Sequence, residues 1–360
     1  MGEAHIPEGL GDQPVSPRKE NTVAYKRRDL LKLGLGALPL GHLLARPGSL
    51  LAAPAGSTFG GVEIGIIAPY AFRGTARSAE EILEGIVKLG IGGVEMQSPP
   101  AEVFAGAPPA PPRRRQGPPP GAGPAAAATG GNAPPQRRRR ELTPEQQAAR
   151  KTRAEEMQKW RLSAPMDKFA ELRKMYNDAG VRIYGFKLAL TESMPDAEYD
   201  YCFEAAKALG ASHVTMELSD NTERIGKFAA KHEVYVGYHN HTQVDAHSWD
   251  AALAQSPYNG INLDAGHFTA ATSGSPIPFI KKHHARITSM HCKDRKYGDD
   301  RTNNLPWGQG QTPLREILQL MKREQYKFPA TIELEYPVPE DSTVMAELKK
   351  CFDYCKEALA

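Results

Sequence analysis

Residues 234–267, VYVGYHNHTQVDAHSWDAALAQSPYNGINLDAGH, decide the fold class of this chain. They contain an apolar, β-rich run over 234–239, a stretch of helical character at 248–255 and a second β-rich run over 261–264. Strands that alternate with helices in this way predict a parallel sheet. Both strands end in ionisable residues, and this ending recurs along the chain.

The same alternation continues on both sides and predicts eight strand–helix units. The expected strands cover residues 62–69, 92–96, 182–187, 213–217, 234–239, 261–264, 287–291 and 331–335. The expected helices cover residues 78–90, 166–179, 196–208, 221–231, 248–255, 276–284, 313–324 and 342–358. Eight units over roughly 300 residues indicate a (β/α)8 TIM barrel. A doubly wound open sheet is the alternative, which is weakened because no G-x-G-x-x-G turn follows the first strand.

One segment interrupts the barrel pattern after the second strand. Residues 99–140 contain 12 prolines, 6 glycines and two arginine runs, Arg113–Arg115 and Arg137–Arg140. Such a composition cannot bury enough apolar surface to offset the entropy of ordering the chain. We therefore expect a disordered, low-complexity insertion over 99–142. An extra helix over 143–162 follows it, since Thr143 and a proline form a helix-start signal.

The N-terminal 55 residues read as an export signal rather than as part of the fold. Lys26–Lys32 (KRRDLLK) resembles a twin-arginine signal, and an apolar run over 33–45 and small residues around 53–55 follow it. The apolar run is too short and too rich in glycine for a stable membrane span. We expect the twin-arginine export machinery as a partner and a periplasmic or extracytoplasmic location, with residues 56–360 forming a single TIM-barrel domain.

Charge is unevenly distributed along the chain. The whole sequence has a net charge of +3, whereas residues 56–98 and 166–360 together hold 26 basic and 32 acidic residues. The excess of basic over acidic residues therefore comes from the leader and from the insertion with the helix that follows it. A slightly acidic barrel has no general nucleic-acid footprint, so we expect no nucleic-acid partner. Four cysteines are too few for a disulfide framework.

Ionisable side chains stand at the ends of seven of the eight expected strands. The carboxyl ends of the strands of a TIM barrel meet at one face, where active sites are built. Charged side chains are rarely buried there unless they are paired or hold a metal. Two glutamates, an aspartate and a histidine offer three oxygens and one nitrogen, a set that suits Mn²⁺, Co²⁺, Mg²⁺ or Zn²⁺ with positions open for substrate.

The period of two along a strand sorts these side chains by direction. Glu333 and Glu335 should both point into the barrel. His239 and His241 should likewise share one face, with Asn240 between them on the other.

Five segments carry a resemblance to a known family. The segments are Glu217, His239-Asn240-His241, Asp264-Ala265-Gly266-His267, His291-Cys292-Lys293-Asp294 and Ile332-Glu333-Leu334-Glu335. In this order they resemble the xylose isomerase-like TIM-barrel superfamily, the sugar phosphate isomerase/epimerase group, over about 60–98 and 166–340. The resemblance implies one divalent metal ion held by Glu217, Asp264, His291 and a glutamate of the last strand. Glu333 is favoured over Glu335, which lies nearer the loop.

The resemblance also implies the chemistry. Glu217 and Glu333 would flank the sugar and act as acid and base through an enediolate intermediate. Residues that would bind substrate are His239, His241, His267, Lys187, Lys293, Glu335 and Trp307. For Lys187 and Lys293 the alternative is a salt bridge to a neighbouring carboxylate, and for Trp307 it is a cap on the barrel.

Several functions remain open on this evidence. The leading expectation is a metal-dependent isomerase or epimerase of a sugar or sugar-like keto or hydroxy substrate. A lyase or dehydratase acting on a keto-sugar or keto-glycoside would use the same metal site, and a non-catalytic carbohydrate-binding barrel is a further alternative. The related apurinic endonuclease activity is disfavoured, because strand three supplies Lys187 rather than a histidine and no histidine lies between Cys292 and Gln311. The sequence leaves the oligomeric state open.

Overall fold

The computed structural model describes residues 56–109, 143–298 and 304–360. Contacts divide the chain into residues 1–49 and 50–360, and only the second unit contains described residues. The export signal expected over 1–55 and most of the expected insertion therefore lie outside the described residues.

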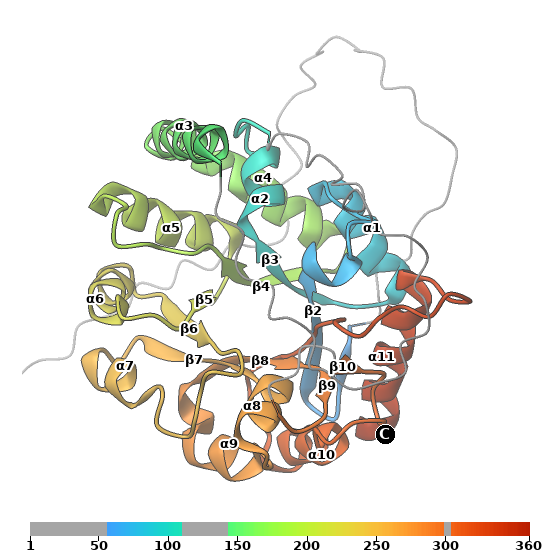
Figure 1. Cartoon of the computed structure of the whole chain (residues 1–360). Helices are drawn as coiled ribbons and strands as arrows, with labels where there is room; N and C mark the ends of the chain where they lie inside the picture. Colours follow the sequence, from blue (N-terminus) through green and yellow to red (C-terminus); the bar gives the residue numbers. More distant parts are fainter. Residues whose placement is uncertain (1–55, 110–142, 299–303) are drawn as a thin grey trace, which may run out of the picture. The chain divides into compact units, whose positions relative to one another are not determined.

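Eight parallel strands form a closed barrel at the centre of the second unit (Figure 1). The barrel strands are β2 (Val62–Ala68), β3 (Gly93–Gln97), β4 (Arg182–Lys187), β5 (His213–Glu217), β6 (Tyr235–His239), β7 (Asn259–Asp264), β8 (Ile287–Cys292) and β11 (Ala330–Ile332). The barrel closes because β2 pairs in parallel with both β3 and β11. The (β/α)8 barrel predicted from the sequence is thus confirmed.

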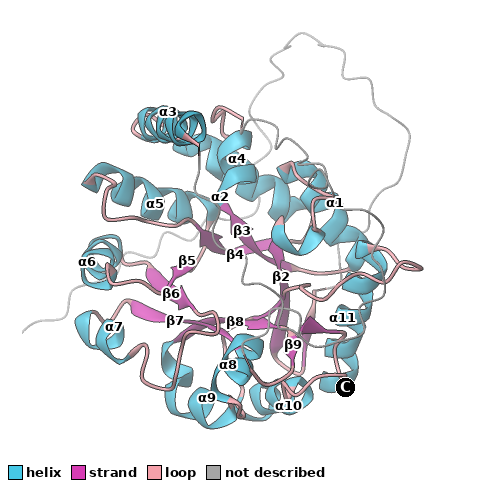
Figure 2. Cartoon of the chain, in the orientation of Figure 1, coloured by secondary structure: helices cyan, strands magenta, loops and turns pink. Residues whose placement is uncertain are grey.

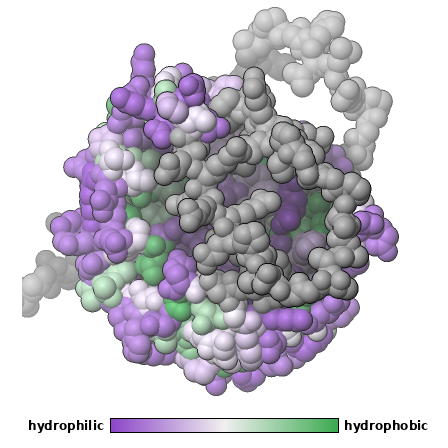
Figure 3. Space-filling view, in the orientation of Figure 1, coloured by the Kyte–Doolittle hydropathy of each residue, from purple (hydrophilic) through white to green (hydrophobic). Residues whose placement is uncertain are grey.

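The helices form a ring outside the strands (Figure 2), and their outer faces are mostly hydrophilic (Figure 3). They are α1 (Ala79–Leu89), α2 (Ser98–Phe104), α3 (Pro144–Arg161), α4 (Met166–Asp178), α5 (Asp196–Leu209), α6 (Thr222–His232), α7 (Asp250–Gln255), α8 (Ala265–Thr272), α9 (Ile277–His283), α10 (Leu314–Glu324) and α11 (Val344–Leu359). The short elements are β1 (Thr58–Phe59), η1 (Tyr70–Phe72), η2 (His284–Arg286), β9 (Asp294–Arg295) and β10 (Asn304–Leu305). None of the helices in the described ranges is long and apolar enough to cross a membrane.

Local sequence signals fix several helix ends. Ser78 and Glu81 form a capping box at the start of α1, and Gly90 ends that helix in the left-handed conformation. Thr143 caps α3 in the same way, with a proline in its first turn. These boundaries agree with the sequence prediction because each depends on neighbouring residues only.

Besides the short elements, two helices and one barrel strand differ from the sequence prediction. Helix α2 occupies residues 98–104, where the insertion was expected to begin at 99, because prolines are tolerated in the first turn of a helix and Ala101 and Glu102 are buried. Helix α8 was not predicted; it begins directly after Asp264, whose carboxylate caps it by accepting the hydrogen bond of the His267 N–H. Strand β11 ends at Ile332 rather than at 335, so the two glutamates after it lie on irregular backbone.

The extra helix α3 is attached to the barrel at its C-terminal end. Arg161 forms ion pairs with Glu102 of α2 at 2.8 Å and with Glu198 of α5 at 2.9 Å, and all three side chains are nearly buried. Trp160 packs against Phe169 and Tyr201. The rest of α3 has no buried residue.

The barrel interior is polar over much of its length. Residues Thr215, Asn262, Ser289 and Thr331 point inward from four strands and are fully buried. Their outward neighbours, such as Val214 and Met290, belong to the hydrophobic core between the strands and the helices. An interior of hydrogen-bonding side chains leads up to the carboxyl ends of the strands. The four cysteines are buried and free.

The loop after β8 is organised by a buried carboxylate. Asp294 accepts hydrogen bonds from the backbone N–H groups of Gly308 at 2.8 Å, Gly310 at 2.9 Å and Thr312 at 3.1 Å. A Cβ atom at Gly310 would lie 2.1 Å from Asp294 Oδ1. The close approach of this backbone to the carboxylate therefore requires glycine.

We expect Gly310→Ala to lower the free energy of unfolding by roughly 1–3 kcal/mol, the usual cost of forcing an extra carbon into a packed site. Chemical denaturation followed by circular dichroism measures this change. Gly274→Ala is the matched control, because its added Cβ would meet only ordinary contacts at 3.6 Å and beyond. Equal stability of the two variants would contradict the assigned role of the carboxylate.

Candidate functional site

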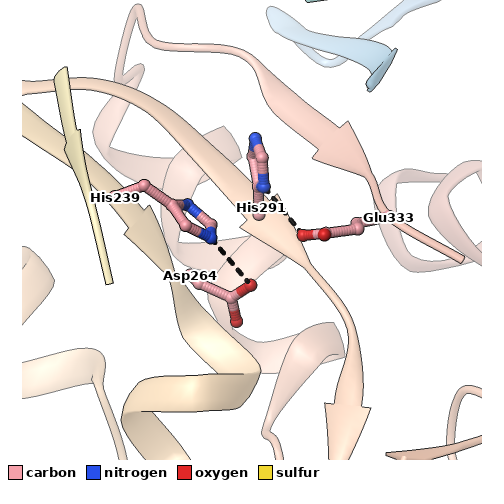
Figure 4. A group of neighbouring side chains, drawn as sticks. All are labelled: His239, Asp264, His291 and Glu333. Atoms are coloured by element: carbon pink, nitrogen blue, oxygen red, sulfur yellow. Dashed lines mark hydrogen bonds and ion pairs between the residues drawn. The ribbon is translucent and has the colours of Figure 1, made fainter. Parts of the chain in front are cut away.

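Four buried side chains meet at the carboxyl end of the barrel. They are His239 at the end of β6, Asp264 at the end of β7, His291 on β8 and Glu333 just after β11. One potential ligand atom from each lies within 4.8 Å of the other three. Figure 4 shows that each histidine turns one ring nitrogen toward a carboxylate of this quartet and the other away from it.

His291 lies between two carboxylates. Its Nδ1 is 2.8 Å from Glu333 Oε2 and its Nε2 is 2.9 Å from Glu95 Oε2. Burial opposes a charge on the ring, but the two carboxylates outweigh it and raise the pKa of His291 to about 10. Burial likewise opposes ionisation of Glu95, whereas the His291 charge and hydrogen bond hold the pKa of Glu95 at about 2.

His239 is held differently. Its Nδ1 lies 2.6 Å from Asn262 Oδ1, and its Nε2 lies 4.0 Å from Asp264 Oδ2. Burial, together with the nearby positive charges of Lys187 and His291, keeps the pKa of His239 well below its usual value. The ring is therefore neutral and carries one proton.

Asp264 has one oxygen engaged and one oxygen without a hydrogen bond. Its Oδ1 accepts the His267 N–H at 2.7 Å, while the fully buried Oδ2 has no hydrogen-bond partner. Lys293 Nζ lies 2.9 Å from Oδ2, at ion-pair distance but outside hydrogen-bond geometry. Burial and the neighbouring Glu333 raise the pKa of Asp264, an effect that Lys293 opposes.

Lys293 is the cation of this cluster. Its buried ammonium lies 2.9 Å from Asp264, 3.0 Å from Glu333 and 2.7 Å from Glu335, and 3.0 Å from His267 Nε2. Burial disfavours the charge, but the three carboxylates raise the pKa of Lys293 above its usual value.

The quartet fits a divalent metal ion. Asp264 Oδ2 has no hydrogen-bond donor, and it lies 4.0 Å from His239 Nε2 and 2.9 Å from the Lys293 ammonium, so it is an oxygen ligand placed where a cation already stands. Two imidazoles and two carboxylates form a donor set that suits Zn²⁺, Co²⁺ or Mn²⁺. The inner carboxylates also outnumber the two cations that contact them, Lys293 and His291. These carboxylates are Glu95, Asp264, Glu333 and Glu335.

Glu217, the predicted fourth ligand, lies at the mouth of the site instead of in the quartet. Its side chain is 48% exposed and forms ion pairs with Lys187 at 3.1 Å and His241 Nε2 at 3.0 Å. Glu217, His239 and His241 form a second group whose ligand atoms lie within 4.8 Å of one another. Burial opposes ionisation, but His241 and Lys187 lower the pKa of Glu217, and the Glu217 hydrogen bond raises the pKa of His241.

A small polar cavity of about 280 Å³ opens above the quartet. It is lined by Tyr70, His241, His267, Arg295, Asn304 and Glu335. The Tyr70 hydroxyl donates to Glu335 Oε1 at 2.5 Å, and Arg295 lies 2.6 Å from His267 Nδ1. Burial and Lys293 hold the pKa of His267 at about 3, so this ring is neutral.

The structure brings most of the residues singled out in the sequence to one site. His241, His267 and Glu335 line the cavity, while Lys187 and Lys293 are both ion-paired. His239 belongs to the quartet, although the sequence analysis assigned it to substrate. Trp307 packs edge-on against Tyr354 of α11 and is not among the residues that line the cavity.

Sequence reasoning missed Glu95, Asn262, Tyr70 and Arg295. Glu95 stands at the end of the second strand, and Arg295 continues the inward period of His291 and Lys293, so both carried a usable signal. Asn262 lies in the middle of an apolar strand, and Tyr70 follows the first strand without a distinctive pattern.

Comparisons with solved structures place the fold among known barrels. The probable 3-DHS dehydratase AsbF from Bacillus anthracis is 13% identical with a TM-score of 0.52, covering 82% of this chain and 97% of AsbF. The IOLI protein, solved with a bound zinc atom, is 13% identical with a TM-score of 0.51, covering 82% and 98%. The 3-keto-D-glucoside 4-epimerase YcjR from E. coli is 9% identical with a TM-score of 0.50, covering 82% and 99%. No curated protein matches the chain.

These identities are low enough that the structural matches establish the fold alone. The family assignment comes from the sequence itself, because residues 147–355 match the family described as "Xylose isomerase-like TIM barrel". That match spans more than half of the chain and includes every residue of the quartet. The chain therefore belongs to the xylose isomerase-like TIM barrel family.

Proposed function

We propose that the protein is a divalent-metal-dependent enzyme that isomerises or epimerises a sugar or sugar-like keto or hydroxy substrate through an enediolate. The observation that carries this proposal is the buried quartet with the unsatisfied Asp264 Oδ2 at the carboxyl end of the barrel. Active sites of this fold are built at that face. The AsbF, IOLI and YcjR barrels support the class, since their names include a dehydratase, a zinc-containing protein and a keto-sugar epimerase.

We assign the metal to His239, Asp264, His291 and Glu333. When bound there, a divalent cation would polarise adjacent carbonyl and hydroxyl oxygens of the sugar and acidify the carbon-bound hydrogen beside them. Glu333 already contacts His291 and Lys293 through one oxygen, so it is held ionised inside the cluster. This enclosure suits a ligand better than a group that exchanges protons with substrate.

Proton transfer falls to groups at the mouth. Glu217 is half exposed and is kept ionised at neutral pH by His241 and Lys187, so it can accept a carbon-bound proton. Glu335 lines the cavity on the side of Tyr70 and can return or receive a proton there. Two carboxylates, one at the end of β5 and one after β11, can thus act on a substrate held between them.

The cavity favours a substrate of about the size of one sugar ring. Its volume of about 280 Å³ lies just below the usual range for ligand pockets, about 300–1,000 Å³. Its walls carry hydroxyl, imidazole, guanidinium, amide and carboxylate groups, which match sugar hydroxyls. The export signal that the sequence predicts over residues 1–55 favours action outside the cytoplasm on a free or glycosidic sugar.

Elimination is the second candidate, because it shares the first proton abstraction. Tyr70 and His241 stand at the cavity and could each protonate a leaving oxygen. The reaction would then be that of a lyase or dehydratase acting on a keto-sugar or keto-glycoside.

The test is turnover in D₂O with Mn²⁺, Co²⁺ or Zn²⁺, using a panel of free sugars, 3-keto-sugars and glycosides. We expect metal-dependent deuterium incorporation at the carbon beside the carbonyl, followed by NMR. Release of water or an aglycone would instead identify the lyase. A protein that binds the metal ions but turns over none of the substrates would point to a carbohydrate-binding barrel and would overturn the proposed enzyme.

A further inference from the structure

One fully buried carboxylate of the barrel does not belong to the quartet. Glu95 on β3 is fully buried and accepts three hydrogen bonds. The donors are Thr215 Oγ1 at 2.8 Å, His291 Nε2 at 2.9 Å and Asn262 Nδ2 at 3.4 Å. Each donor comes from a different strand, so Glu95 links three strands across the interior.

The Glu95 carboxylate accepts hydrogen bonds from Thr215 and His291, and its role as an acceptor fixes the orientation of Asn262. The amide group must turn its Nδ2 toward Glu95, where it also donates to Ser289 Oγ at 2.6 Å. Its Oδ1 then faces His239 Nδ1 at 2.6 Å. Because Oδ1 can only accept, His239 Nδ1 must carry a hydrogen.

The same carboxylate engages the second histidine directly. His291 donates its Nε2 hydrogen to Glu95, so the other nitrogen, Nδ1, is the one on the quartet side. Figure 4 shows one ring nitrogen of each histidine turned into the quartet. These atoms are His239 Nε2, on the side of Asp264, and His291 Nδ1, on the side of Glu333.

We propose that Glu95 is a positioning residue that fixes a ring hydrogen on each histidine, on His291 Nε2 directly and on His239 Nδ1 through Asn262. One buried carboxylate thereby determines that His239 presents Nε2 and His291 presents Nδ1 to a cation. A group that orients a metal-binding imidazole through its far nitrogen commonly contributes 10–100-fold to metal affinity. The inference rests on the proposed function only for the effect on metal affinity, because the position of the His239 ring hydrogen is a property of the metal-free protein.

The Asn262 link has a definite consequence when it is broken. Without an acceptor at Nδ1, the His239 proton has a better partner at Nε2, where the unsatisfied Asp264 Oδ2 lies 4.0 Å away. The ring would then place a hydrogen where it otherwise presents a lone pair. Asn262→Leu, which has a similar volume and no acceptor, creates this situation.

The first measurement is the ¹⁵N NMR spectrum of histidine side chains in the metal-free, full-length protein. In the unmodified protein we expect His239 protonated at Nδ1, and in Asn262→Leu we expect protonation at Nε2. A spectrum of the unmodified protein with the proton on Nε2 would overturn the proposal without any variant.

The second measurement is Zn²⁺ affinity by equilibrium dialysis against a competing chelator. We expect about a 10–100-fold loss in Asn262→Leu. Thr215→Val is the matched control, because it removes one Glu95 hydrogen bond of the same interior and leaves the path through Asn262 intact. Equal losses in the two variants would indicate general damage to the core and would overturn the proposal, whereas failure of every sugar to react would leave the tautomer result unaffected.

Discussion

Asp264→Asn will lose divalent-metal binding by a factor of at least about 100 and with it the metal-dependent turnover, because it removes a charged ligand rather than a supporting group. Asn keeps the amide oxygen that caps α8 through the His267 N–H. It replaces the unsatisfied Oδ2 by a neutral group. Dialysis against Zn²⁺ with elemental analysis measures the retained metal.

The fold should survive this change. Burial and Glu333 raise the pKa of Asp264, so its ionised form costs stability at neutral pH, and that cost disappears with a neutral side chain. We therefore expect metal-free Asp264→Asn to unfold at a denaturant concentration close to that of the unmodified protein. Unchanged Zn²⁺ binding in a folded variant would refute the assigned quartet.

Glu217→Gln is the contrasting variant. Because Glu217 lies half exposed between Lys187 and His241, we expect Zn²⁺ affinity to change little while turnover falls about 10²–10⁴-fold, as for a lost acid–base group. If Glu217→Gln loses the metal as Asp264→Asn does, Glu217 is a ligand, as the family resemblance implies.

The contrast between Glu217 and His239 shows what the sequence could and could not predict. The sequence singled out both residues at the ends of adjacent strands, where they pair in register. Which of them joins Asp264 depends on the neighbours of each side chain: Lys187 and His241 draw Glu217 to the mouth, and Asn262 holds His239 inside. These contacts join residues from different strands, and no local pattern encodes them.

The fold itself was largely predictable because strand–helix alternation and capping are local. The unpredicted helix α8 shows where a prediction from local patterns fails. The segment Asp264-Ala265-Gly266-His267 was interpreted only as a site motif, yet its aspartate is also a helix cap. Glu95 was visible at a strand end, but its importance comes from fully buried contacts with His291 and Asn262.

Lys293→Met will destabilise the metal-free protein by roughly 3–5 kcal/mol, the usual cost of removing one partner from a buried ionic cluster. The ammonium contacts three carboxylates within 3.0 Å, and Met keeps most of the apolar stem. Without the ammonium, Asp264, Glu333 and Glu335 would face one another with less compensating charge. Urea denaturation of metal-free samples measures the loss.

Lys187→Met is the matched control, since its ion pair with the half-exposed Glu217 should contribute less than about 1 kcal/mol. The two lysines also differ in their relation to the metal. Lys293 occupies the same carboxylates that a divalent cation would use, so its removal should leave metal affinity equal or higher, and saturating Zn²⁺ should restore part of the lost stability by binding only the folded state. If Lys293→Met were as stable as Lys187→Met, or if Zn²⁺ restored nothing, the carboxylates around Lys293 would not form the cation site assigned to them.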